Sequence, residues 1–214
     1  MHKTLLEGLE RALILCAHTD DEAGCAGTIC RLIEAGVEVR YVALSRCEES
    51  VPEPYPKDIL EQECRACTRA LGIREDNVEV WGYPVRYFPD HRQAILERFV
   101  RLSREYKPDL VLLSSSFDTH QDHSTVFKEG FRAFKFSSVM GYEQPQNLVS
   151  FENTAFVRLT EQHIDRKLSA LTSYESQAFR TYSSPDFVRG LARVRGVQCN
   201  AAYAEAFEVI RLVV

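Results

Sequence analysis

Short apolar segments alternate with longer amphipathic segments along the chain, and this alternation constrains the fold more than any other feature. Arg11–His18 and Leu110–Ser114 are the most strongly apolar segments, as expected of central strands. Further strands are expected at Val37–Ser45, Val78–Trp81, Ala155–Leu159 and Ala206–Val213, and helices at Glu22–Ala35, Lys57–Leu71, His91–Tyr106, Glu161–Ser173 and after Pro185. Strands that alternate with helices build a parallel sheet with helices on its faces. The pattern therefore predicts an α/β fold with a mostly parallel sheet flanked by helices.

No linker, repeat or low-complexity tract interrupts this pattern, so we expect a single domain over residues 1–214. The hydrophobic fraction of 45% and the charged fraction of 27% are typical of a soluble globular domain. The apolar segments are much shorter than the roughly 18 to 20 residues of a membrane-spanning helix. Near the N-terminus, charged residues at Lys3, Glu7, Glu10 and Arg11 interrupt the apolar stretch that a secretory signal needs. We expect a cytoplasmic protein without a membrane partner.

The chain carries a formal net charge of -5, and its lysines and arginines are scattered rather than clustered. Such a charge repels nucleic acid and anionic lipid, so neither is an expected partner. The seven cysteines have no regular spacing, which argues against a disulfide framework. Cys64 and Cys67 have the spacing of redox and zinc pairs, but they fall inside a predicted helix with no second pair nearby. We interpret them as ordinary helix thiols.

Histidines and aspartates cluster directly after the two most apolar segments. The clusters are His18, Asp20 and Asp21 after the first segment, and His120, Asp122 and His123 after the second. Open α/β folds bind ligands at the carboxyl edge of the sheet, where both clusters are expected to lie. Two imidazoles and one carboxylate form a common catalytic zinc set, and a similar set holds non-haem iron. Because three of the six histidines fall here, we predict a metal site for zinc, with Fe²⁺ as the alternative.

These clusters have other interpretations besides a metal site. An aspartate after a strand often caps the next helix, and a histidine there often bonds to the backbone, so neither cluster alone decides the matter. A dinucleotide site is disfavoured, because Gly24 and Gly27 do not form the pattern G-x-G-x-x-G and the acids Asp20–Glu22 repel phosphate. The G-x-S-x-G turn of serine hydrolases does not occur. The coincidence of two clusters favours the metal site.

The two clusters resemble paired motifs of a known family. Ala17–Glu22 (AHTDDE) and His120–His123 (HQDH) are similar to the motifs AHPDDE and HPDH of the PIG-L or LmbE-like N-deacetylases, with Thr19 and Gln121 at the proline positions. Weaker similarity continues through Lys167–Leu171, Tyr174–Gln177, Arg195–Gly196 and Tyr203–Phe207, so the resemblance covers essentially the whole chain. It implies a zinc-dependent enzyme with a Rossmann-like fold that removes N-acetyl groups from amino sugars and glycoconjugates.

The resemblance also implies a role for each residue of the clusters. His18, Asp21 and His123 would bind zinc, and Asp20 would be the general base. His120 would stabilise the tetrahedral intermediate, and either His120 or Asp20 would give the leaving amine its proton. We further expect Asp122 to accept a hydrogen bond from the imidazole of His120 and to raise its pKa.

The substrate site is less defined by the sequence. Arg46, Arg86 and Arg92 lie in polar loops and suit phosphate or carboxylate recognition, although each is also interpretable as a solvated surface arginine. Tyr142 is an aromatic side chain that could stack on a sugar ring. By analogy, the substrate is an N-acetylated amino sugar, free, lipid-linked or attached to a nucleotide, in surface-glycan biosynthesis.

Three alternatives for the function stay open at this point. They are deacetylation of a glucosaminyl precursor of a thiol cofactor, deacetylation of a natural-product glycoside, and a non-catalytic sugar-binding or metal-binding module on the same fold. Intact Asp20 and His120 argue against the last, because a binding module needs neither a base nor an oxyanion donor. A homo-oligomer is compatible with every one of these functions.

Overall fold

The two most apolar strands lie side by side at the centre of the sheet. In the computed structural model, which describes residues 8–213, β1 (Arg11–Cys16) pairs in parallel with β4 (Leu110–Ser114) on one side and with β2 (Glu38–Ala43) on the other. All residues of β4 and five of the six residues of β1 are buried. Because neither strand has a face toward solvent, both carry aliphatic residues almost without interruption.

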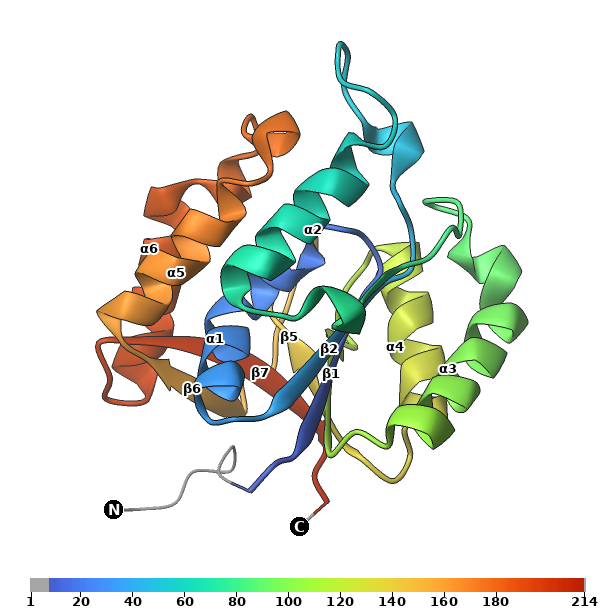
Figure 1. The fold of residues 1–214 in the computed structure, drawn as a ribbon. Coiled ribbons are helices and arrows are strands. Elements are labelled where there is room, and N and C mark those ends of the chain that lie inside the picture. Colours follow the sequence, from blue (N-terminus) through green and yellow to red (C-terminus); the bar gives the residue numbers. More distant parts are fainter. Residues whose placement is uncertain (1–7, 214) are drawn as a thin grey trace.

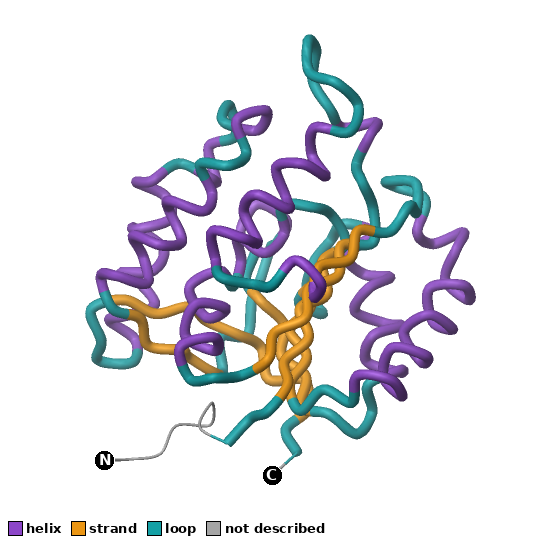
Figure 2. Tube along the Cα trace, in the orientation of Figure 1, coloured by secondary structure: helices purple, strands orange, loops and turns teal. Residues whose placement is uncertain are grey.

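The complete sheet has seven strands in the order β3-β2-β1-β4-β5-β7-β6 (Figures 1 and 2). The remaining strands are β3 (Val78–Val80), β5 (Ser138–Tyr142), β6 (Ala155–Leu159) and β7 (Tyr203–Arg211). β7 runs antiparallel to β5 and β6, whereas the other strand pairs are parallel. The predicted α/β class with a mostly parallel sheet is confirmed.

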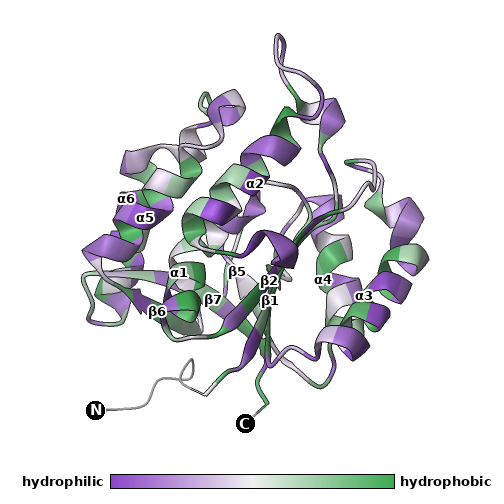
Figure 3. Ribbon diagram, in the orientation of Figure 1, coloured by the Kyte–Doolittle hydropathy of each residue, from purple (hydrophilic) through white to green (hydrophobic). Residues whose placement is uncertain are grey.

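Helices cover both faces of the sheet (Figure 1). They are α1 (Ala26–Glu34), α2 (Ile59–Leu71), α3 (Arg92–Tyr106), α4 (Gln121–Ala133), α5 (Glu161–Leu171) and α6 (Pro185–Gln198). Alternate residues of β1 serve two cores: Ala12 and Ile14 pack with α1 and α2, and Leu13 and Leu15 pack with α3 and α4. Figure 3 shows apolar and polar residues alternating along these helices, as expected where one face of a helix is buried.

The structure differs from the sequence prediction at several places. The helix expected from Glu22 begins later, because Asp21–Gly24 form a 3₁₀ turn and α1 starts at Ala26. The last strand begins at Tyr203 instead of Ala206. The pattern also misses α4, which begins inside a polar segment, and β5, which is short and contains serine and glycine.

Two further sequence expectations concern the cysteines and the membrane. Cys64 and Cys67 lie buried in α2 as free thiols, in agreement with their interpretation. Within residues 8–213, no helix combines the length and the apolar character needed to cross a bilayer. Lys3 and Glu7, on which the expected lack of an export signal partly depends, lie outside the described residues.

A buried carboxylate on β7 fastens the start of α1. Glu205 accepts hydrogen bonds from the backbone N–H groups of Gly27 and Thr28, at 2.9 and 2.7 Å, and pairs with the ammonium of Lys167 at 2.8 Å. Glu205 and Lys167 are each only 6% exposed. A Cβ at position 27 would lie 3.1 Å from the Glu205 carboxylate and 2.5 Å from Leu159, so only glycine allows this approach. The contact holds the turn of Asp20 and Asp21 against the C-terminal part of the sheet.

Replacing Glu205 with alanine should destabilise the protein strongly. The change leaves Lys167 as a buried charge without a partner and removes the acceptor of two amide groups, and breaking a buried ion pair in this way costs about 3–5 kcal/mol. Urea unfolding followed by circular dichroism measures the loss. Arg46→Ala, which removes an exposed ion pair with Glu61, should lower the free energy of unfolding much less. Equal losses of unfolding free energy in the two variants would contradict the proposed contribution of Glu205 to stability.

Candidate functional site

Two short segments far apart in the sequence meet at the carboxyl edge of the sheet. The first follows β1 and contains His18, Asp20 and Asp21, and the second leads into α4, of which His120 is the N-cap. The order of the strands reverses between β1 and β4, since β2 continues the sheet on one side and β5 on the other. Such a reversal leaves a crevice at the strand ends. The structure thus brings together the two clusters that the sequence singled out.

Three atoms from these segments converge as the ligands of a divalent ion do. Nδ1 of His18 lies 3.0 Å from Nε2 of His123, Oδ2 of Asp21 lies 3.4 Å from Nε2 of His123, and Oδ2 of Asp21 lies 3.7 Å from Nδ1 of His18. Tetrahedral zinc with bonds of about 2.0–2.1 Å separates its ligand atoms by about 3.3 Å. Ring nitrogens of His18, His120 and His123 also lie within 4.8 Å of one another. The donor set therefore fits a divalent metal ion.

Each of the two converging imidazoles is held by a carboxylate on its other nitrogen. Nε2 of His18 is 3.0 Å from Oδ2 of Asp122, and Nδ1 of His123 is 2.7 Å from Oδ2 of Asp118. The third converging residue, Asp21, accepts a hydrogen bond on Oδ1 from Gln144 at 2.9 Å, which leaves Oδ2 toward the histidines. Carboxylate partners of this kind fix the orientation of metal-binding imidazoles. Asp118 and Gln144 were not singled out in the sequence.

The position of Asp122 corrects one sequence expectation. Its carboxylate bonds to His18 and accepts the backbone N–H of Arg86 at 2.5 Å, and it makes no hydrogen bond with the ring of His120. Nδ1 of His120 instead accepts the backbone N–H of Asp122 at 3.2 Å. Burial and the neighbouring imidazoles of His18 and His123 lower the pKa of His120, and the charge of Asp122, which acts to raise it as expected, does not outweigh them. The reason is that Asp122, in the first turn of α4, points toward the end of β1.

The pKa values of the two adjacent aspartates are shifted in opposite directions. Burial raises the pKa of Asp20, the negative charge of Asp21 raises it further, and His18 and Arg180 only partly offset this. Burial also acts to raise the pKa of Asp21, but His123 and His18 outweigh it and lower the pKa of Asp21. A carboxylate with a lowered pKa stays ionised as a metal ligand, whereas one with a raised pKa accepts a proton more readily. Asp21 is therefore suited to bind a metal ion, and Asp20 is suited to act as a base.

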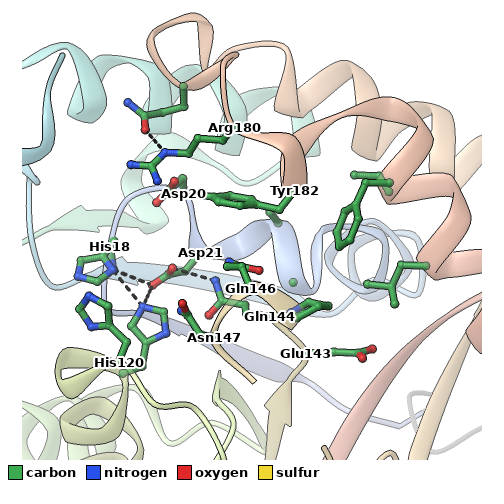
Figure 4. A pocket seen from close by; sticks show the side chains of 18 of the residues that line it. His18, Asp20, Asp21, His120, Glu143, Gln144, Gln146, Asn147, Arg180 and Tyr182 are labelled. Atoms are coloured by element: carbon green, nitrogen blue, oxygen red, sulfur yellow. Dashed lines mark hydrogen bonds and ion pairs between the residues drawn. The ribbon is translucent and has the colours of Figure 1, made fainter. Parts of the chain in front are cut away.

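A cavity of about 570 Å³ opens over this cluster. Besides the cluster, its lining includes Arg86, Glu143, Gln144, Gln146, Asn147, Arg180, Tyr182 and Arg195. Figure 4 shows Arg180 and Tyr182 on the far side of Asp20 from the histidines. The segment Glu143–Asn147 directly follows β5, so it also lies at the carboxyl edge of the sheet. Polar residues that follow a strand lie at the carboxyl edge of the sheet here as well. The sequence did not predict this segment as part of the site, because β5 was not recognised as a strand.

Of the four candidate substrate residues, the structure places only Arg86 in the lining of the cavity. Arg46 pairs with Glu61 at 3.1 Å, and Arg92 pairs with Glu129 at 2.6 Å, where it joins α3 to α4. Tyr142 is fully buried, and its hydroxyl donates to the carbonyl oxygen of Leu15 at 3.1 Å. These three side chains serve packing and surface ion pairs, and we do not retain them as substrate residues.

Comparison with known proteins identifies relatives of this chain. A family model described as PIG-L, GlcNAc-PI de-N-acetylase, matches residues 13–134, which is more than half of the chain and includes both clusters. An uncharacterized deacetylase of Escherichia coli K12, YaiS, is 23% identical over 169 residues, or 77% of this chain and 90% of that protein.

Solved structures show how widely the fold is used. The N,N'-diacetylchitobiose deacetylase of Pyrococcus horikoshii matches with a TM-score of 0.81 and 20% identity, over 96% of this chain and 85% of that one. GalB, the 4-carboxy-2-hydroxymuconate hydratase of Pseudomonas putida KT2440, matches with a TM-score of 0.76 and 23% identity, over 96% of this chain and 98% of that one. At these identities the likeness shows the fold alone, because one fold can support different reactions.

The family model, in contrast to the solved structures, matches by sequence, and the matched residues include His18, Asp20, Asp21 and the His120–His123 segment. These residues lie together in the structure, at the carboxyl edge of the sheet, where open α/β folds bind ligands. The sequence, the fold and the site agree, and the chain belongs to the PIG-L family of de-N-acetylases.

Proposed function

We propose that the protein hydrolyses the N-acetyl group of an amino sugar, with release of acetate and a free amine, and that zinc is its metal. One observation carries the proposal: donor atoms of His18, Asp21 and His123 converge with separations of 3.0 to 3.7 Å, beside a second aspartate that is not needed as a ligand. Fe²⁺ suits the same donors. A divalent ion held there would polarise the acyl carbonyl and make water acidic enough to attack it near neutral pH.

Asp20 is the residue best suited to act as the base. It is half-buried, lines the cavity next to Asp21, and has a raised pKa because of its burial and the charge of its neighbour. An amide is hydrolysed only if its nitrogen leaves with a proton. In this proposal a carboxylate oxygen of Asp20 takes the proton of the attacking water and passes it to the departing nitrogen.

His120 acts in this proposal as a hydrogen-bond donor to the oxyanion. Its Nδ1 accepts the N–H of Asp122, so in the neutral ring the proton resides on Nε2. A lowered pKa favours that neutral form. A fixed donor in a buried site stabilises negative charge that develops on the carbonyl oxygen. Asp122 contributes indirectly, since it orients His18.

The cavity also supports a sugar as substrate. Its volume of about 570 Å³ exceeds what an acetamide needs, and pockets of roughly 300–1,000 Å³ hold ligands of drug size. Gln144, Gln146 and Asn147 add amide groups that can bond to hydroxyls (Figure 4). The substrate form, free, lipid-linked or nucleotide-linked, the role in surface-glycan synthesis, the cytoplasmic location and a homo-oligomeric state stay predictions, as do the alternatives of a thiol-cofactor precursor and a natural-product glycoside.

Asp20→Ala should retain the metal and lose nearly all turnover. Removal of a general base costs roughly 10²- to 10⁴-fold in rate, while the ligand atoms of His18, Asp21 and His123 stay in place. Metal content is measured by mass spectrometry, and acetate release by a coupled assay. His123→Ala is the matched variant and should lose the metal itself. Retained turnover in Asp20→Ala excludes Asp20 as the base.

Asp118→Asn should weaken metal binding without removing a ligand. The carboxylate at 2.7 Å from Nδ1 of His123 orients the ring, and loss of such a partner typically costs about 10- to 100-fold in metal affinity. Competition with a chromophoric chelator gives the affinity of the purified variant. Asp76→Asn changes an exposed aspartate and serves as the control. Unchanged affinity in Asp118→Asn would show that this carboxylate does not support the metal site.

A panel of substrates tests the reaction itself. Purified protein with a measured zinc content should release acetate from at least one N-acetylated amino sugar, nucleotide sugar or glycoside, at a rate that chelation abolishes and zinc restores. Metal-loaded protein that releases acetate from no member of the panel would favour a binding module or another reaction on this fold.

A further inference from the structure

The positively charged residues that line the cavity fall into two kinds. Lys167 pairs with Glu205 at 2.8 Å, and Arg195 forms a two-pronged ion pair with Glu143, with Nε to Oε2 at 2.9 Å. Arg86 and Arg180 also line the cavity, yet within residues 8–213 neither makes an ion pair with a carboxylate. Guanidinium groups stay charged at every physiological pH. Two of the cavity's positive charges are therefore paired directly with a carboxylate and two are not.

Arg180 is held in place by neutral groups. Its Nε donates to Oε1 of Gln177 at 2.5 Å, and the guanidinium lies over the rings of Phe179 and Tyr182, with centroids at 5.3 and 5.6 Å. Within residues 8–213, the terminal NH₂ groups of Arg180 bond to no carboxylate, and Tyr182 is their neutral neighbour. Figure 4 shows Arg180 reaching toward the cavity beside Asp20. A half-buried arginine in a fixed orientation with free donors is a preorganised anion receptor.

Arg86 is held at the other side of the site by its backbone. Its φ of 74° lies in the left-handed region, which is unusual for a residue with a side chain, and its N–H donates to Asp122 at 2.5 Å. The same carboxylate binds His18, so the backbone of Arg86 is tied to the metal-binding cluster. The side chain is exposed and lines the cavity. The chain thus accepts an uncommon conformation at a position next to the reacting groups.

The acidic residues at this end of the cavity are Asp20, Asp21 and Glu49. With a divalent cation in the proposed site, the charges of Asp20 and Asp21 are compensated. Glu49 also lines the cavity but is exposed, so water screens its charge. Asp118 and Asp122 bond to the histidines and do not line the cavity, so Arg86 and Arg180 are the guanidinium groups that face this end without a carboxylate partner within residues 8–213. At the other end, Arg195 pairs with Glu143 and Lys167 pairs with Glu205.

We propose that Arg86 and Arg180 bind an anionic group of the substrate, a phosphate or a carboxylate carried by the N-acetylated sugar. The planar guanidinium offers paired donors that match the oxygens of either group. A substrate anion between the two arginines supplies the negative charge that no carboxylate of the described residues provides to them. The proposal rests on the proposed deacetylation and adds its substrate class: an amino sugar with a negative charge close to the acetamido group.

Arg180→Gln and Arg86→Gln test the proposal, with three substrates that differ in charge. N-acetylglucosamine is neutral, N-acetylglucosamine 1-phosphate carries a phosphate, and N-acetylmuramic acid carries a carboxylate. The unaltered enzyme should prefer one of the anionic sugars, and each variant should lose roughly 10- to 100-fold in kcat/KM for that sugar, the value of a charge-assisted hydrogen bond. The loss for the anionic sugar should exceed the loss for the neutral sugar by about tenfold or more, so that the preference between the two substrates falls in each variant. Arg46→Gln, an exposed ion-paired arginine outside the cavity, should leave all three rates unchanged.

Each outcome decides whether Arg86 and Arg180 bind an anionic group of the substrate. Whichever anionic sugar shows the loss identifies the group as phosphate or carboxylate. Equal losses for neutral and anionic sugars would overturn the proposal, because the arginines would then act on Asp20 or on the fold. If no sugar is hydrolysed, the deacetylation fails, and calorimetry with glucosamine 1-phosphate against glucosamine still tests the anion site. The anion-site proposal would be overturned if the unaltered protein binds glucosamine 1-phosphate no more tightly than glucosamine, or if Arg180→Gln binds glucosamine 1-phosphate as tightly as the unaltered protein does.

Discussion

The pairing of β1 with β4 is the contact on which the site depends. These strands are separated by almost a hundred residues, yet Ala12, Leu13 and Ile14 pair with Leu110, Val111 and Leu112 in parallel register. Parallel pairing places both carboxyl ends at one edge, so the segments that follow β1 and β4 must leave the sheet side by side. The burial of both strands between two layers of helices favours this register, because a shift would disrupt the close packing of their side chains against both layers. The apolar core therefore determines where the polar cluster lies.

Around the converging donor atoms, the protein supplies a layer of hydrogen-bond partners that face the other side of each ligand. Asp122 and Asp118 hold the two imidazoles, and Gln144 holds the free oxygen of Asp21. These partners come from α4, from the segment before it and from the segment after β5. Three elements must pack correctly before the donor atoms can converge. The site is consequently a property of the assembled sheet and not of either motif alone.

The sequence predicted the fold class and the residues of the cluster because both leave local signals. Aliphatic continuity marks buried strands, and histidine beside aspartate at a strand end is rare enough to be noticed. The partners of the cluster left no such signal. Asp118 stands five residues before His123 in a generally polar segment, and Arg180 lies in a loop without regular structure, so their roles arise only from packing. The bond from Asp122 to His18 was missed for the same reason, since proximity in sequence favoured His120.

The position of β7 has a consequence for how the molecule is made. β6 (Ala155–Leu159) pairs only with β7 among the described strands, and β7 comes more than forty residues later in the chain. Until β7 has left the ribosome, β6 has no strand to join and the amides of Gly27 and Thr28 lack the carboxylate of Glu205, which is 178 residues away from Gly27. Contacts between such distant segments form late and slowly. A nascent chain that already contains both histidine motifs therefore still lacks the anchor of the helix that follows Asp20 and Asp21, and that anchor comes only with β7.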